Sequence, residues 1–219
     1  MEPEFWQQRW RDNRIAFHEG RVNRHLEAFW PGLGGTEGEL VFVPLCGKAF
    51  DLAWLGSRGH RVIGVELSER ACRAFFAERG IEPTVTEQGQ FVRFSHDRIE
   101  LLCGDFFDLG PEYVQGARLL YDRAALIALP AELRPRYCEH LTRLMGAGTR
   151  GLLITLNYPP QDFHGPPFAV DESEVRGHLH RHFDLQRLYM GPLGPDDPLL
   201  ARGLVGGSES VYRLDALER

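Results

Sequence analysis

The stretch 40–66 constrains the fold more than any other part of the chain, because it predicts a strand, a helix and a second strand in direct succession. The first apolar run, 40–43, ends at a tight turn over 45–47, and the second run, 61–65, ends in Glu66. A right-handed helical crossover returns the chain to the same edge of the sheet, so we expect the two strands to be parallel. Neither run alternates apolar and polar residues, which is typical of strands covered on both faces.

Ligands of open parallel sheets bind beyond the carboxyl ends of the strands, where Glu66 is expected to lie. An acid placed about twenty residues after the first turn accepts hydrogen bonds from a ribose diol in nucleotide-binding sheets. The turn has neither of the glycine-rich phosphate-binding patterns, since Gly47-Lys48 is followed by Ala49 and no glycine precedes it at the required spacing. We therefore favour a nucleoside cofactor without phosphate, of which S-adenosylmethionine is the common one. The alternative is an ordinary buried unit in which Glu66 caps the next helix.

The whole chain predicts an α/β fold with a mostly parallel, doubly wound sheet of about seven strands and an N-terminal helical extension. We expect a hairpin-like pair before the middle of the chain and an antiparallel pair at its end. The expected helices are 2–14, 23–30, 68–79, 131–145 and 171–181, and the expected strands are 40–43, 61–65, 91–96, 99–103, 117–121, 151–156, 183–190 and 208–214.

No linker or low-complexity tract divides the chain, so we expect one domain over 1–219, with 1–35 as an N-terminal helical lid. Aromatic residues in this lid recur at helical spacing. Either they pack into the core, or Trp10 and Phe17 cover a ligand at the strand ends.

Acidic residues follow three consecutive expected strands: Glu66, Asp105 and Asp122. Asp105 precedes Phe106, and this pair suits an adenine ring, with the carboxylate near the exocyclic amine and the phenyl face stacked on the base. The alternative is that these aspartates cap the helical turns that follow, which fits Asp122 equally well.

Composition excludes several classes of function. The 219 residues, 43% hydrophobic and 26% charged, are ordinary for a globular protein, and the net charge of −6 provides no global basic field for nucleic acid or acidic membranes. The four cysteines include no C-x-x-C pair, which indicates a reducing compartment. No apolar stretch approaches membrane-spanning length. We therefore expect a cytoplasmic monomer that acts on a small molecule and binds neither nucleic acid nor membrane.

Three other interpretations remain open at this point. An NAD-dependent oxidoreductase also places an acid after its second strand, although the dinucleotide-binding glycines are absent here. A non-catalytic nucleoside-binding module is compatible with the same sheet. The alternating histidines of 178–182 resemble a metal site, but no acidic or thiol partner lies at ligand spacing, so we expect surface histidines and no metal.

The chain resembles the thiopurine S-methyltransferases, in particular the bacterial branch. The resemblance is carried by the segments F-W-x3-W-x4-I-x-F-H-E-G-x-V-N (5–23), VFVPLCGKAFDLAWL (41–55), VIGVELSE (62–69), GDFFDL (104–109) and YDRAALIALP (121–130). It implies the seven-stranded class I fold of S-adenosylmethionine-dependent methyltransferases. It also implies methylation of the sulfur of aromatic or heterocyclic thiols, with S-adenosylhomocysteine as product, and an association with selenium and tellurium species.

The same resemblance assigns roles to individual residues. It implies that Trp10, Leu45, Glu66 and Arg123 contact the cofactor, and that Asp105 and Phe106 form the loop beside the adenine. On the substrate side it implies Phe17 and, through a poorly matching C-terminal part, Arg202. We expect Arg123 to be the catalytic residue, holding an anionic substrate or the cofactor carboxylate in a partly dry site. The alternative role for Arg123 is a buried ion pair with Asp122.

Overall fold

The computed structural model describes residues 3–14, 20–159, 161–195 and 197–218. By contact density the chain forms two compact units, Met1–Tyr121 and Asp122–Arg219. The N-terminal unit contains the predicted strand–helix–strand stretch, and the C-terminal unit contains the segments that follow the sixth strand.

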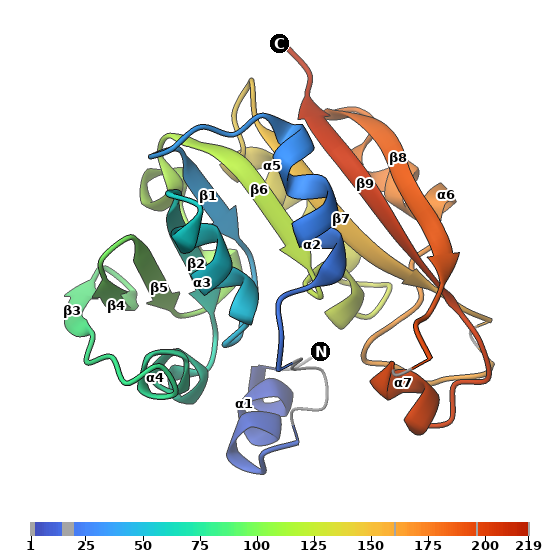
Figure 1. Ribbon diagram of the computed structural model, residues 1–219, viewed down its shortest axis with the longest axis horizontal. Helices are drawn as coiled ribbons and strands as arrows, with labels where there is room; N and C mark the ends of the chain where they lie inside the picture. The colour runs from blue at the N-terminus through green and yellow to red at the C-terminus, as the bar shows by residue number, and fades with distance from the viewer. Residues whose placement is uncertain (1–2, 15–19, 160, 196, 219) are drawn as a thin grey trace. The chain divides into compact units, whose positions relative to one another are not determined.

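The sheet of the N-terminal unit has the strand order β3-β4-β5-β2-β1-β6. Four adjacent strands, β5-β2-β1-β6, are parallel, so their carboxyl ends lie at one edge (Figure 1). The predicted parallel pairing of the first two strands is confirmed, and the predicted hairpin is an antiparallel pair. The strands are β1 (Leu40–Val43), β2 (Arg61–Glu66), β3 (Thr84–Gln88), β4 (Phe91–His96), β5 (Ile99–Cys103) and β6 (Ala117–Arg123), the last of which ends in the C-terminal unit.

Local capping explains where two helices of the N-terminal unit, α2 and α4, begin. The Asn23 side chain accepts hydrogen bonds from the N–H groups of His25 and Leu26, and the Ser68 hydroxyl accepts one from Ala71. The helices are α1 (Pro3–Arg11), α2 (Arg24–Phe29), α3 (Phe50–Ser57) and α4 (Glu69–Ala77), with 3-10 turns η1 (Trp30–Leu33), η2 (Phe106–Asp108) and η3 (Pro111–Val114). The expected cap of the second helix is therefore confirmed.

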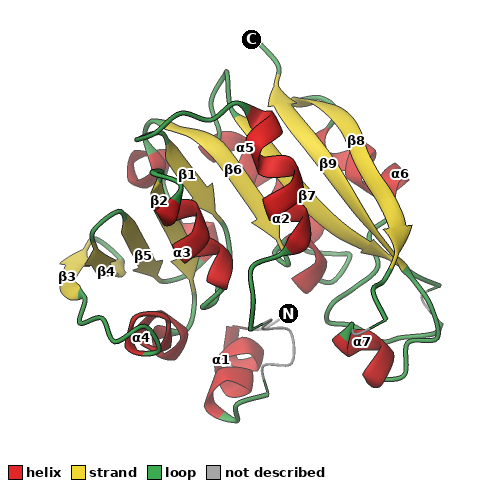
Figure 2. Ribbon diagram, in the orientation of Figure 1, coloured by secondary structure: helices red, strands yellow, loops and turns green. Residues whose placement is uncertain are grey.

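The C-terminal unit contains three long strands in the order β7-β9-β8, paired antiparallel (Figure 2). The expected antiparallel pair at the end of the chain is thus confirmed. The elements are η4 (Leu126–Ala128), α5 (Arg134–Leu144), β7 (Arg150–Asn157), α6 (Glu172–Leu179), β8 (Phe183–Pro192), α7 (Pro198–Ala201) and β9 (Ser208–Ala216).

The α/β class is confirmed. The described residues contain nine strands, whereas a mostly parallel sheet of about seven was expected. The observed pairing is mixed, because β3, β4, β8 and β9 run antiparallel to their neighbours. The one observed strand that matches none of the eight expected strand ranges is β3. All five of its residues are exposed, and it pairs with β4 through its backbone. A strand without a buried face leaves no apolar pattern in the sequence.

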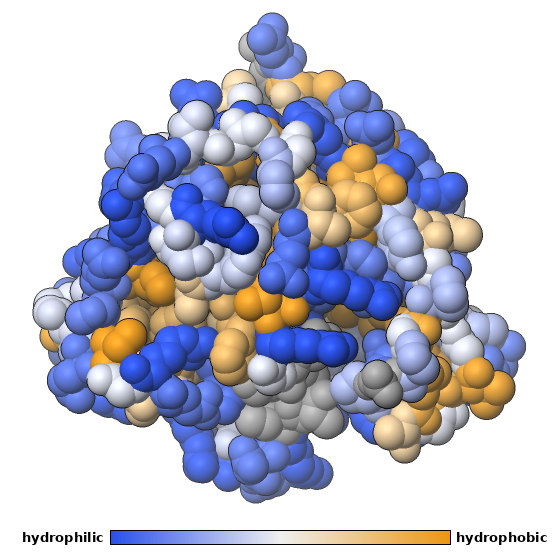
Figure 3. All heavy atoms as spheres, in the orientation of Figure 1, coloured by the Kyte–Doolittle hydropathy of each residue, from blue (hydrophilic) through white to orange (hydrophobic). Residues whose placement is uncertain are grey.

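Each unit has its own apolar core. Phe42, Phe75 and Phe94 are fully buried in the N-terminal unit, and Tyr212 and Leu214 are almost fully buried in the C-terminal unit. On the face shown in Figure 3, hydrophilic residues predominate and hydrophobic residues form small separate groups. In the described parts of the chain, no helix has the length and apolar character that crossing a membrane requires.

Candidate functional site

Glu66 is a buried carboxylate at the carboxyl end of β2. The side chain is held from both sides: one carboxylate oxygen accepts from the Gly47 N–H at 2.9 Å, and the other accepts from the Ser68 N–H at 2.8 Å. Glu66 is 7% exposed. A carboxylate oxygen accepts more than one hydrogen bond, so each oxygen keeps acceptor capacity beyond its backbone donor.

Burial dominates the electrostatics of this carboxylate. It raises the Glu66 pKa from 4.5 to about 7, against the lowering effect of the hydrogen bonds from the Ser68 and Gly47 backbone. Two N–H donors therefore compensate only part of the cost of ionising the group. Any ligand that donates further hydrogen bonds to Glu66 favours its charged form.

The turn after β1 has an unusual backbone. Leu45 has φ of +45° and Gly47 has φ of +55°, so both residues occupy the left-handed region. Glycine adopts this region without strain, but a bulky leucine does not. Such strain in a non-glycine residue costs on the order of 1–2 kcal/mol and is concentrated at functional sites. The strained turn directs the Gly47 N–H at Glu66, which couples the two expected cofactor contacts, Leu45 and Glu66.

The indole of Trp10 packs against this turn. A Cβ built on Gly47 lies 3.4 Å from the Trp10 ring, and Trp10 is only 5% exposed. Helix α1, which carries Trp10, contacts α4, and the Arg70 guanidinium donates to the Arg11 carbonyl at 3.3 Å. The structure thus brings Trp10 to the turn whose Gly47 N–H donates to Glu66.

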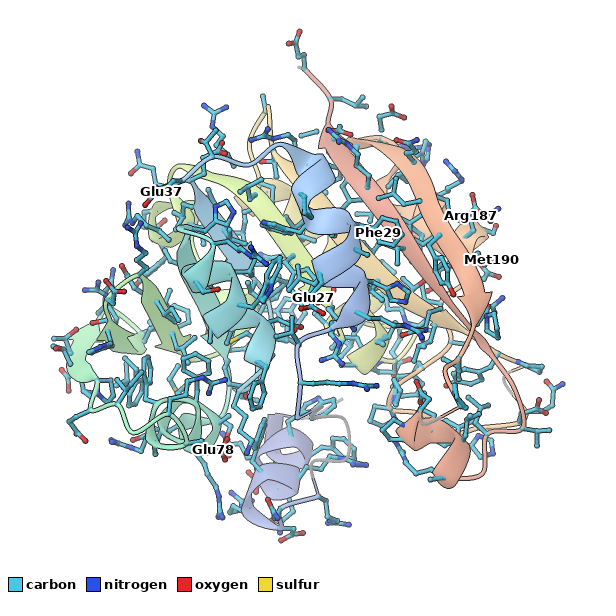
Figure 4. The ribbon with its side chains drawn as sticks, viewed as in Figure 1. Glu27, Phe29, Glu37, Glu78, Arg187 and Met190 are labelled. Atoms are coloured by element: carbon cyan, nitrogen blue, oxygen red, sulfur yellow. The ribbon has the colours of Figure 1, made fainter. Side chains whose placement is uncertain are left out.

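Lys48 was not selected from the sequence as a site residue. It is 9% exposed and pairs with Glu78, the residue after the last turn of α4 (labelled in Figure 4). This ion pair connects the turn after β1 to the helix that follows Glu66. A lysine next to a glycine in a turn is ordinarily exposed, so the sequence carried no signal of this contact.

Asp105 and Phe106 follow the neighbouring strand, β5. The Gly104 N–H donates to the Glu66 carbonyl at 3.0 Å, so this loop lies beside Glu66. The Asp105 carboxylate accepts from the Phe107 N–H at 2.9 Å and caps η2, as the capping alternative expected. Phe106 is 5% exposed and stacks on Phe42, with ring centroids 6.5 Å apart, so much of its ring surface is already covered.

Arg123 and Asp122 end β6 and belong to the C-terminal unit. Asp122 is 1% exposed and accepts from the Tyr137 hydroxyl at 2.7 Å and from the Leu126 N–H at 3.3 Å. Burial raises its pKa from 3.8 to about 6. Arg123 is partly buried, and Ala124 after it has φ of +64°. Successive side chains of a strand point to opposite faces, so Arg123 points away from the face that buries Asp122.

The second substrate-side arginine, Arg202, follows α7. Its guanidinium lies 4.7 Å from the centroid of the Phe163 ring and donates to the Pro166 carbonyl at 3.2 Å. Tyr158 packs edge-on against Phe163. Phe17, the other expected substrate contact, lies outside the described residues.

The histidines of 178–182 do not form a ligand cluster within the described chain. His178 lies 3.5 Å from Glu174 on the same helix, and His180 follows the helix end with its Nδ1 2.6 Å from the Arg176 carbonyl. Among the residues with described positions, no three histidine, cysteine or acidic side chains are grouped so that they could hold a metal ion.

The donors and acceptors around Glu66 fit a nucleoside. A buried carboxylate with remaining acceptor capacity suits a vicinal diol, and the capped loop at Asp105 offers a second acceptor beside it. Nothing in the 45–47 turn reproduces the glycine-rich cradle of a pyrophosphate site. The arrangement therefore favours a nucleoside without phosphate.

Comparisons with known proteins agree with this geometry. Residues 1–216 match the family described as "Thiopurine S-methyltransferase (TPMT)". The thiopurine S-methyltransferase of Marinobacter nauticus is 46% identical over 216 residues, which cover 98% of this chain and 99% of that protein. The thiopurine S-methyltransferase of Azotobacter vinelandii is 48% identical over 217 residues, with the same coverage.

Solved structures of low identity share the fold. The 1,6-didemethyltoxoflavin-N1-methyltransferase of Burkholderia thailandensis, solved with S-adenosylhomocysteine bound, has a TM-score of 0.63 at 17% identity, covering 97% of this chain and 87% of that one. The magnesium protoporphyrin IX methyltransferase of Synechocystis has a TM-score of 0.63 at 15% identity, covering 97% and 99%. The family match sets aside the oxidoreductase and binding-module alternatives. This chain belongs to the thiopurine S-methyltransferase family, and it is a methyltransferase that depends on S-adenosylmethionine.

Proposed function

We propose that this protein transfers a methyl group to the sulfur of an aromatic or heterocyclic thiol, such as a thiopurine, with Glu66 as the main anchor of the methyl donor. One observation carries the proposal. Glu66 is buried at the end of a parallel strand, with both carboxylate oxygens oriented by backbone N–H groups, in a chain of the thiopurine S-methyltransferase family.

The donor side uses residues of the N-terminal unit. S-adenosylmethionine supplies a methyl group activated by a positively charged sulfur. Glu66 accepts hydrogen bonds from the ribose, Leu45 and Trp10 enclose the donor at the strained turn, and Asp105 with the Phe106 loop contacts the adenine. The contact between Trp10 and Gly47 supports a lid role for 1–35, because it places an N-terminal aromatic ring on the turn itself.

Two arginines are our candidates for holding the acceptor. Arg123 is a partly buried cation at a strand end, and Arg202 lies over the Phe163 ring. Cations next to aromatic rings suit an anionic, planar acceptor, because the guanidinium attracts the charge and the rings stack on the heterocycle. Arylthiolates and ionised thiopurines are both anionic and planar. We choose this class of acceptor for that reason.

No strong general base is required for this reaction. An aromatic thiol ionises close to neutral pH, so its thiolate attacks directly and its proton goes to solvent. The protein then contributes by aligning the two sulfur atoms with the methyl group between them and by excluding water. Arg123 stabilises the thiolate as it is held for attack.

An acceptor screen with labelled S-adenosylmethionine tests the proposal. We expect label transfer to thiophenols and thiopurines, and none to matched phenols and purines that lack the sulfur. Glu66→Ala should abolish most of the transfer, whereas Glu87→Ala, which removes an exposed carboxylate of β3, should not. Transfer to the oxygen analogues at equal rates, or no transfer to any thiol, would contradict the proposal.

The same screen extends to selenite and tellurite, because the selenium or tellurium atom of each carries a lone pair that can attack the methyl group. The net charge of −6 supports small-molecule acceptors over nucleic acid, and the four free cysteines support a reducing, cytoplasmic location. We propose that the protein is a single-domain monomer, and its mass in solution tests this.

A further inference from the structure

Asp51 is a buried acid in the first turn of α3, and it is none of the residues assigned to the site above. It is 1% exposed. One carboxylate oxygen accepts from the Asn23 N–H at 2.8 Å, and the other accepts from the Tyr121 hydroxyl at 2.9 Å. An acid in the first turn of a helix is ordinarily exposed, so the sequence gives no signal of these contacts. The Asp51 carboxylate therefore joins the start of α2, α3 and the β6 residue that ends the N-terminal unit.

We propose that Asp51 is a positioning residue for the methyl donor, and that its hydrogen bonds to Asn23 and Tyr121 hold the turn after β1 so that the Gly47 N–H points at Glu66. The proposal rests on the proposed role of Glu66, although the hold on the turn can be tested without any ligand. Three features support it: the link between α3 and the turn, the rigidity of the two donors and the strain in the turn.

The turn and the start of α3 form one hydrogen-bonded stretch. The Ala49 N–H donates to the Cys46 carbonyl at 3.3 Å, and the Leu52 N–H donates to the Ala49 carbonyl at 3.3 Å. Ala49 is the N-cap residue of α3, and its methyl side chain cannot accept a capping hydrogen bond. Asp51, two residues later, supplies a hold that the N-cap side chain lacks, and a shift of Asp51 would move the turn with it.

Both donors to Asp51 are themselves held in place. Asn23 is 4% exposed, and its side chain caps α2 by accepting from two backbone N–H groups of the first turn, at 2.9 and 3.3 Å. Tyr121 is 1% exposed, and its ring packs edge-on against the Trp30 indole with centroids 6.1 Å apart. Hydrogen bonds to a carboxylate are stronger than those between neutral groups, so these two contacts fix Asp51 against rigid partners.

The turn needs such a hold because its backbone is strained. Leu45 has φ of +45°, a conformation that a leucine keeps only where the surrounding structure enforces it. On the β1 side of the turn, the Cys46 N–H donates to a β2 carbonyl at 2.9 Å. On the α3 side, Asp51 ties the chain to α2 and β6. Release of the α3 side would let the turn relax and withdraw the Gly47 N–H from Glu66.

Withdrawal of the Gly47 N–H would change Glu66 in a measurable way. The hydrogen bonds from the Gly47 and Ser68 backbone lower the Glu66 pKa against the effect of burial. With one donor withdrawn, the Glu66 pKa rises further above its usual range. Because the ionised carboxylate is the form that accepts from both ribose hydroxyls, donor affinity then begins to fall at a higher pH than in the wild type.

Amide hydrogen exchange of the ligand-free protein tests the hold on the turn. We expect the Gly47 amide to exchange about tenfold faster in Tyr121→Phe, which keeps the Asp51 charge, and faster still in Asp51→Asn, which leaves one acceptor oxygen for two donors. Tyr137→Phe is the matched control, because it removes a buried hydrogen bond from a tyrosine to an aspartate, at 2.7 Å, in the C-terminal unit. Unchanged Gly47 exchange in folded Tyr121→Phe or Asp51→Asn, or an equal rise in Tyr137→Phe, would overturn the proposal.

A second pair of variants isolates the hydrogen bond from Asn23. Asn23→Ala and Asn23→Pro both lose the cap of α2, but only proline also lacks the N–H that donates to Asp51. The Asn23 φ of −68° suits the proline ring. We expect faster Gly47 exchange in Asn23→Pro than in Asn23→Ala, and equal rates would overturn the role given to this contact.

Calorimetry with S-adenosylhomocysteine tests the consequence for the donor site. Tyr121→Phe should bind about threefold more weakly than the wild type at pH 8 and about tenfold more weakly at pH 6, because its Glu66 is protonated at a higher pH. Both proteins share the other titratable side chains on the elements around Glu66, which include Cys46 and Lys48 of the turn, Glu69 and Cys72 of α4, Cys103 of β5 and Asp105. An equal loss at both pH values, or no loss, would overturn the link to Glu66. Equal affinity in the wild type and Glu66→Ala would instead contradict the proposed function, and Gly47 exchange would still decide whether Asp51 holds the turn.

Discussion

Glu66 and Asp122 are both buried acids at the carboxyl ends of strands, yet the fold gives them different partners. Glu66 accepts hydrogen bonds from two backbone N–H groups of loops, whereas Asp122 accepts one from the Tyr137 side chain and one from the backbone. The Tyr137 hydroxyl and the Asp122 carboxylate satisfy each other inside the C-terminal unit. No side chain in the described parts of the chain donates to Glu66, which keeps acceptor capacity for a ligand. An acid at a strand end is thus paired with a buried side chain in one unit, and in the other it keeps acceptors for the ligand that we propose.

The largest expected effect that tests this contrast comes from Glu66→Ala. The ribose diol loses its buried acceptor, so we expect S-adenosylhomocysteine to bind weaker by about 3 kcal/mol, which is roughly a hundredfold in Kd. Isothermal titration calorimetry measures it, with Glu87→Ala as the exposed control. Equal affinity in Glu66→Ala and wild type would remove the binding role from this carboxylate.

Arg123→Ala tests whether the residue after Asp122 serves the reaction. Loss of a charge-assisted contact should lower kcat/KM for a thiopurine by about 2 kcal/mol, or roughly thirtyfold. Arg118→Ala is the matched control, because Arg118 is an exposed arginine of the same strand. If both variants show the same kcat/KM, Arg123 is not a catalytic residue.

Asp122→Ala should affect stability more than binding. The substitution leaves the buried Tyr137 hydroxyl without its acceptor, so we expect the free energy of unfolding to fall by about 2 kcal/mol. Urea denaturation measures this loss, and Asp122→Asn, which retains an acceptor, should lose less. A stable Asp122→Ala protein whose cofactor affinity falls as far as that of Glu66→Ala would erase the distinction between the two acids.

The pH dependence should separate binding from stability at Glu66. The Glu66 pKa rises from 4.5 to about 7 on folding, so the folded protein holds this proton more tightly than the unfolded chain does. The stability that this proton provides is fully present below pH 4.5 and is lost as the pH rises towards 7. Ligand binding through the carboxylate has the opposite sign, and S-adenosylhomocysteine affinity should fall by about tenfold between pH 8 and pH 6. Titration calorimetry across this range checks the prediction, and Glu66→Gln should flatten both profiles. An affinity that increases towards acid pH would contradict it.

Much of the N-terminal unit was predictable because its signals are local. Apolar runs ending in a turn and in Glu66 specify β1 and β2, and Ser68 marks the start of α4. The position of Glu66 as a site candidate follows from the general geometry of parallel sheets. Strand β3 was missed because its exposed residues carry no apolar pattern.

The α/β class, the parallel β1–β2 unit and the acids at the strand ends were predictable from local patterns, because burial patterns and caps act over a few residues. Which acid retains free acceptors depends on the fold, since the partners Gly47 and Tyr137 come from separate elements. The fold also buries Lys48 against Glu78. Contacts between residues distant in sequence depend on packing, and no local pattern encodes them.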